Sequence, residues 1–172
     1  MAITKIQSES LNLADDFAFT GTITGAGGVN TPAFYTRRTG SNQSIGDNVL
    51  TKAQFNTKDL DTNNCYDNST NYRFTPNVAG KYYVFSMIRS SSDDSLLYES
   101  YMEFKKNGTF LPENTYVYIS TGNHLITINA FAIVEMNGTT DYLEVFARMD
   151  RMTNNSCLIT SGSNFGGYKI IT

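Results

Sequence analysis

Residues 72–85 constrain the fold of this chain more than any other segment, because one turn signal lies between two strand signals. Tyr72 and Phe74 end a stretch with the alternation of a strand, and Pro76 and Gly80 then mark a turn. The aromatic residues that follow immediately are Tyr82, Tyr83 and Phe85. Aromatic side chains favour half-buried, pleated strands, so this segment predicts β-structure.

The composition also favours an all-β fold. Aromatic residues make up 13% of the chain and are all Tyr or Phe, while Asn, Thr, Ser and Gly are abundant. This combination is typical of short strands joined by turns. A chain of 172 residues suits one domain with an appendage, and a domain of that size needs neither a disulfide nor a metal to fold.

Strand signals recur at short intervals from Thr31 onward. The expected strands begin at Pro32 and then cover residues 49–55, 82–88, 96–105, 116–119, 125–136, 142–149 and 165–171. Residues 38–47 and 58–71 are predicted to be polar loops. Several short strands at this spacing indicate an antiparallel jelly-roll β-sandwich.

Two Asn-Gly pairs predict tight turns, because both residue types tolerate a positive φ. They are Asn107-Gly108 and Asn137-Gly138. In the strand between residues 96 and 105, a period of two separates two sets of side chains. One face is expected to carry Tyr98, Ser100, Met102 and Phe104, and the other Leu97, Glu99, Tyr101 and Glu103.

Residues 32–172 resemble the C1q/TNF-like jelly-roll domains. The matching positions are Pro32-Ala33-Phe34, Phe55, Asn64, Tyr66-Asp67, Phe74-Thr75, Pro76, Gly80, Tyr82-Tyr83, Phe85, Lys106-Asn107-Gly108, Asp141, Val145, Phe165 and Gly167. Asn71 replaces a glycine of the pattern, which a positive-φ turn accepts, and Thr140 stands where a second glycine is usual. The resemblance implies a binding module that forms homotrimers through apolar and aromatic contacts.

The resemblance further implies which side chains form the core or the trimer interface. They are Phe34, Phe55, Phe74, Tyr82, Tyr83, Phe85, Phe165, Gly167 and Tyr168. The strand that begins at Tyr82 is apolar on both faces, which predicts that one face meets the sandwich core and the other a sister chain.

Residues 1–30 differ from the rest and are expected to form an extended anchoring arm ahead of the domain at residues 31–172. Apolar and hydroxyl residues alternate over residues 17–24, and Gly25 to Gly28 form a flexible joint. The apolar residues predicted to anchor the arm are Ile3, Ile6, Leu11, Leu13, Phe17, Phe19 and Ile23. The arm resembles the openings of bacteriophage fibre and adhesin-type virion proteins.

Charge and sorting signals limit the partners. The net charge is −3 and no basic stripe is present, which argues against nucleic acid. No run of 18 apolar residues exists, so insertion into a membrane is not expected. The chain shows no signal-peptide pattern, so it is expected to be made in the host cytoplasm and to reside in the virion. Cys65 and Cys157 are expected to be thiols, with a long-range disulfide as the alternative.

No motif indicates catalysis, and no cofactor is expected. The single histidine, His124, has no Gly-x-Ser-x-Gly elbow beside it, so it is interpreted as a loop-edge or interface residue. Asp59, Asp61 and Asn63 have the alternating oxygen ligands of a Ca²⁺ loop, but Asn64 and Thr70 depart from that pattern. An exposed turn is therefore favoured there, with Ca²⁺ binding left open.

These observations predict a non-enzymatic virion protein: a homotrimeric knob that its arm anchors to the particle, for host attachment through a surface receptor or for surface display. The alternative is a capsid or tail decoration protein that stabilises neighbouring subunits without reading a receptor. A depolymerase would need paired carboxylates in a groove, and Asp15-Asp16 and Asp93-Asp94 are merely adjacent. A soluble cytokine-like ligand is disfavoured by the missing secretion signal.

Overall fold

A computed structural model describes residues 30–92, 97–152 and 155–170. The predicted anchor residues Ile3, Ile6, Leu11, Leu13, Phe17, Phe19 and Ile23 lie outside the described residues. All the regular secondary structure in the described residues is β-strand, which confirms the all-β prediction.

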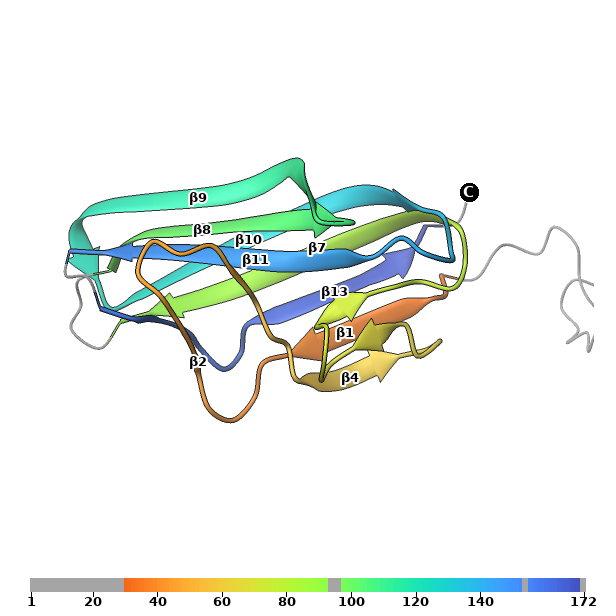
Figure 1. Ribbon diagram of the computed structural model, residues 1–172, viewed down its shortest axis with the longest axis horizontal. Coiled ribbons are helices and arrows are strands. Elements are labelled where there is room, and N and C mark those ends of the chain that lie inside the picture. The colour runs from red at the N-terminus through yellow and green to blue at the C-terminus, as the bar shows by residue number, and fades with distance from the viewer. Residues whose placement is uncertain (1–29, 93–96, 153–154, 171–172) are drawn as a thin grey trace, which may run out of the picture.

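The strands form two antiparallel sheets (Figure 1). Sheet A contains, in spatial order, β2 (Gln43–Ile45), β12 (Cys157–Ile159), β7 (Gly80–Ser91), β13 (Asn164–Lys169), β1 (Ala33–Arg37) and β4 (Thr57–Asp61), with β10 (Leu125–Met136) paired to β7. Sheet B contains β5 (Tyr66–Asp67), β6 (Arg73–Phe74), β11 (Leu143–Arg151), β8 (Leu97–Lys106) and β9 (Thr109–Asn123), with β3 (Thr51–Lys52) paired to β11.

Aromatic rings fill the space between the sheets. Phe34 of β1 stacks on Phe74 of β6 at a centroid distance of 4.2 Å and meets Phe165 of β13 edge-on at 4.9 Å. All three rings are buried, as is Tyr82, whose hydroxyl donates to the carbonyl of Val78 at 2.6 Å. Each such ring contributes about 1.5–3 kcal/mol through burial, so residues far apart in sequence hold the two sheets together.

The turn at Asn107-Gly108 is confirmed. Both residues have positive φ, 52° and 79°, and they join β8 to β9. At the second predicted turn, Gly138 has φ of 73°, and an added Cβ would meet the backbone nitrogen of Ala79 at 2.2 Å. Asn137 shapes this turn through its side-chain oxygen, which accepts backbone N–H groups at residues 139–141. The turn carries the chain from sheet A to sheet B.

Two predicted loops were wrong because they contain edge strands. The segment 38–47 holds β2, where Ile45 is buried against β12. The segment 58–71 overlaps β4 and holds β5. Conversely, only Thr51–Lys52 of the strand expected at residues 49–55 is a strand. Whether these short segments become strands depends on pairing with strands far away in the sequence, and their own polar composition does not indicate that pairing.

Two finer predictions also need correction. Leu97 was expected opposite Met102 and Phe104 but is buried with them, because the register shifts between Leu97 and Glu99 where β8 pairs with β9. Such a β-bulge moves a side chain to the other face. The positive φ expected at Asn71 is found instead at Tyr72, whose φ is 50°.

Both cysteines are buried thiols, as expected. Burial raises the pKa of the Cys65 thiol, and the nearby Asp61 carboxylate raises it further. Within the described residues, no helix has the length and apolar character needed to cross a membrane.

Candidate interaction surfaces

The outward side chains of β1, β7, β10 and β13 form an apolar surface on sheet A, here named the aromatic face. Its members are Tyr35, Tyr83, Phe85, Phe131, Ile133 and Tyr168. The strict alternation of buried and exposed residues along β10 shows why they are outward, since successive side chains point to opposite sides of a sheet.

Strand register places these residues in two rows across the sheet. In one row, Tyr35, Gly166, Phe85 and Phe131 are cross-strand partners in turn. In the other row, Tyr168, Tyr83 and Ile133 are partners. Ring centroids lie 5.6 Å apart for Tyr83 and Tyr168 and 6.1 Å apart for Tyr83 and Phe131. The rows therefore make one continuous aromatic surface over four strands.

Gly166 lets the Phe85 ring of this surface lie close to the β13 backbone. A Cβ at this position would lie 2.6 Å from Cζ of Phe85 and 3.1 Å from the carbonyl oxygen of Phe34. Only a residue without a side chain lets the Phe85 ring lie across β13. A hollow of about 390 Å³ opens beside it, lined in part by Tyr35, Phe85 and Met87.

Phe131 is the most exposed side chain of the aromatic face and is here called its ridge. It is 65% exposed, Ile133 beside it is 62% exposed, and Phe131 borders both the 390 Å³ hollow and a second hollow of about 240 Å³. Lys81 and Glu135, cross-strand partners of opposite charge, lie at one end of the same pair of strands. A large apolar surface with a polar rim marks a site of protein association.

The outer face of sheet B has a different chemistry and is here named the charged face. Each of three mostly buried carboxylates has a cationic partner: Glu99 pairs with Arg148, Glu103 with Lys105, and Glu144 with Lys52. Two of the cations also lie over rings, with Lys105 4.3 Å from the centroid of Phe146 and Arg148 5.4 Å from that of Tyr101. Burial and hydrogen bonding to Glu103 raise the pKa of Tyr101 to about 12.

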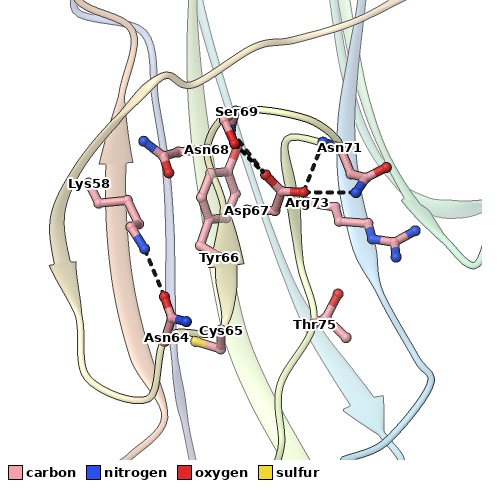
Figure 2. A pocket seen from close by; sticks show the side chains of 10 residues that line it. All are labelled: Lys58, Asn64, Cys65, Tyr66, Asp67, Asn68, Ser69, Asn71, Arg73 and Thr75. Atoms are coloured by element: carbon pink, nitrogen blue, oxygen red, sulfur yellow. Dashed lines mark hydrogen bonds between the residues drawn. The ribbon is translucent and has the colours of Figure 1, made fainter.

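A third feature is a polar hollow of about 540 Å³ beside the β5–β6 hairpin (Figure 2). It is lined by Lys58, Asn64, Cys65, Tyr66, Asp67, Asn68, Ser69, Asn71, Arg73 and Thr75. Amide and hydroxyl side chains dominate this lining, in contrast to the rings of the aromatic face.

Two aspartates hold the walls of the polar hollow in place. Asp67 accepts the backbone N–H groups of Ser69, Thr70 and Asn71 at 2.9–3.0 Å. These hydrogen bonds, the one from Thr70 foremost, hold the pKa of Asp67 well below its usual value. Asp61 accepts the N–H of Cys65 at 2.7 Å, and this and further hydrogen bonds outweigh burial and lower its pKa.

The structure separates the predicted core or interface residues into two groups. Phe34, Phe55, Phe74, Tyr82, Phe165 and Gly167 are buried between the sheets, whereas Tyr83, Phe85 and Tyr168 lie on the aromatic face. Four residues that share that face, Tyr35, Phe131, Ile133 and Gly166, were not assigned to it from sequence. The alternation of side chains along each strand could have placed them on one face. Only the pairing register between strands shows that this is the face of Tyr83 and Phe85.

The calcium candidates lie on β4 and in the turn after it. The carboxylate of Asp59 pairs with Arg37, that of Asp61 with Lys58, and the Asn63 amide faces Asn77. No group of three or more His, Cys, Asp or Glu side chains is placed to hold a metal among the residues described. His124 is exposed in the turn between β9 and β10, and its backbone N–H donates to the side-chain oxygen of Asn123. Calcium binding stays a prediction.

No protein-family model matches the chain, and no curated protein matches it. Solved structures do match. Murine APRIL at pH 5.0 aligns with a TM-score of 0.57 and 11% identity over 80% of this chain and 98% of that one. Eiger TNF from S. frugiperda aligns with a TM-score of 0.52 and 12% identity over 80% of this chain and 91% of that one. At these identities the likeness concerns the fold alone, and that fold is the TNF-like jelly roll.

Proposed function

We propose that this chain is a non-enzymatic homotrimeric knob whose subunits associate through the aromatic face. The observation that carries the proposal is the exposure of Phe131 and Ile133 beside the rings of Tyr83 and Phe85. A surface of this kind left in water would lose the stabilisation of about 1.5–3 kcal/mol that burial gives each large side chain. A second copy of the chain is the occupant that fits best.

Shape favours a second copy. The aromatic face carries both a ridge, Phe131, and a hollow lined by Tyr35, Phe85 and Met87. The ridge of one subunit fits the hollow of the next, which makes the contact heterologous. Heterologous contacts close into rings when the rotation permits, and three subunits form the smallest such ring.

We further propose that the knob belongs to a bacteriophage virion, with residues 1–30 as its anchor and host attachment or surface display as its task. The resemblance of the arm to the openings of phage virion proteins supports this placement. A decoration protein that cements its neighbours without reading a receptor is the alternative.

Deleting residues 1–30 tests the anchor. The shortened chain should still form trimers but should no longer join particles, and normal incorporation would contradict an anchoring role. Binding of the shortened trimer to host cells would favour attachment over cementing. Binding only by whole particles would favour the decoration protein.

A further inference from the structure

The polar hollow holds hydrogen-bonding groups that the fold does not use. The hydroxyl of Thr75 and the side-chain carbonyl oxygens of Asn68 and Asn71 make no hydrogen bond to any described residue. The Asn64 oxygen accepts from Lys58 at 3.0 Å, which leaves its two amide protons available. Unused donors and acceptors therefore occur together among the residues that line the hollow, which Figure 2 shows as sticks.

The charges of the hollow are balanced. Lys58 places its ammonium 3.0 Å from the Asp61 carboxylate, and the Asp67 oxygens are occupied by N–H groups of their own turn. Arg73 lies 4.4 Å from the centroid of the Tyr142 ring and is the cross-strand partner of Asp67. Two cations and one carboxylate line the hollow, and Asp61 beside it neutralises Lys58. The four groups together carry no net charge, which favours a neutral ligand.

The hollow is also shaped in advance. Its volume of about 540 Å³ lies within the range of small-molecule sites, about 300–1,000 Å³. Asn64 and Tyr72 hold φ near 50°, a left-handed conformation that side chains rarely adopt. Asn tolerates this conformation, and hydrogen bonds from Ser69, Thr70 and Asn71 to Asp67 fix the turn that follows Tyr66 and Asp67. A ligand would meet fixed groups and would lose little free energy in ordering them.

We propose that the polar hollow is a binding site for a neutral polyhydroxylated ligand, a glycan fragment of one or two sugar units. A sugar hydroxyl both donates and accepts a hydrogen bond, and the hollow offers donors at Asn64 and Arg73 and acceptors at Asn68 and Asn71. Thr75 supplies a group of either kind. The site lies within a single chain, so it depends neither on the trimer nor on a virion.

Saturation-transfer difference NMR on the full chain tests this site, with maltose, cellobiose, lactose and chitobiose as probes at millimolar concentration. At least one probe should give a saturating signal. Thr75→Val keeps the shape of the side chain and removes the hydroxyl, which should weaken binding about fivefold to tenfold through one lost hydrogen bond. Thr127→Val, on the exposed face of β10, is the matched control and should leave the affinity unchanged.

Three outcomes would overturn the proposal. One is the absence of transfer to all four disaccharides by folded protein. Another is equal affinity in the parent, Thr75→Val and an Arg73→Gln variant, which would place binding elsewhere. The third is binding of inorganic phosphate, blocked by Arg73→Gln, without binding of any sugar, because that would make the hollow an anion site.

Discussion

The outer faces of the two sheets follow the same alternation of side chains but differ in what those side chains need. On the charged face, Glu99, Glu103 and Glu144 each have a cation from the same chain. On the aromatic face, Phe131 and Ile133 extend into solvent. An antiparallel sheet with one solvated polar face is complete by itself. The charges on the outer face of sheet B are paired within the chain, whereas the outer face of sheet A leaves large apolar side chains exposed to water.

The difference also separates stability from association. Removing a group from the charged face should weaken the fold of one chain and leave the assembly intact. Changing the ridge of the aromatic face should do the reverse.

Phe131→Asp should break the assembly. A carboxylate at the ridge would be buried without a partner, so the dissociation constant of the trimer should rise by about 100-fold or more. Sedimentation velocity measures this directly. Tyr118→Asp on the edge strand β9 is the matched control, since Tyr118 is 58% exposed and Phe131 is 65% exposed. Loss of assembly in the control as well would show that the two faces do not differ as claimed.

Gly166→Ala should displace the Phe85 ring of the aromatic face. The new methyl would overlap the Phe85 ring, whose Cζ lies 2.6 Å from the Cβ position. Displacing the ring should cost about 1–3 kcal/mol of unfolding free energy and also weaken association, because Phe85 lines the hollow. Denaturant unfolding and sedimentation should detect both changes, and an unaltered midpoint would refute this role for Gly166.

Arg148→Met should lower stability without affecting assembly. Among the described residues, the Glu99 carboxylate accepts side-chain hydrogen bonds from Arg148 and from the Tyr116 hydroxyl, and the variant would keep only the Tyr116 bond at 3.2 Å. Losing a charge-assisted hydrogen bond to a mostly buried carboxylate should cost about 1–2 kcal/mol. The comparison is Arg37→Met, which removes the more exposed pair with Asp59 and should cost less than Arg148→Met, because solvent screens an exposed pair. Equal losses in chemical unfolding would contradict the ranking.

Asp67→Asn should have the smallest effect, and that effect should depend on pH. The folded-state pKa of Asp67 lies below its ordinary 3.8. Its stabilisation is therefore fully present above that value and is lost as the pH falls through the folded pKa. The variant should be about 1 kcal/mol less stable at neutral pH, and the difference should shrink in acid. Glu113→Gln, an exposed control, should show no such convergence.

The sequence predicted the features that local signals determine. The turn at Asn107-Gly108 and the aromatic strand after Gly80 are determined by residues that are adjacent in the sequence. The polar strands β2 and β4 were missed because their partners, β12 and β1, are far away in the chain. Edge strands are often short and polar, so their composition resembles that of a loop.

The candidate surface was only partly predictable for a related reason. Period two shows that Tyr82 and Tyr83 face opposite ways, but it does not show which one enters the core. The pairing of β7 with β10 and β13 decides this, because it places Phe131 and Gly166 beside Phe85. In the same way, the polar hollow forms only when the fold brings β4 and the β5–β6 hairpin together, since Lys58 of β4 and Arg73 of β6 both line it.

The molar mass of the full chain in solution is the most direct test of the central claim that sister chains cover the aromatic face. Sedimentation equilibrium at micromolar concentration should give three times the chain mass of 19.1 kDa. The value should hold at high salt, because an apolar contact is not screened. A stable mass of 19.1 kDa under the same conditions would contradict the claim.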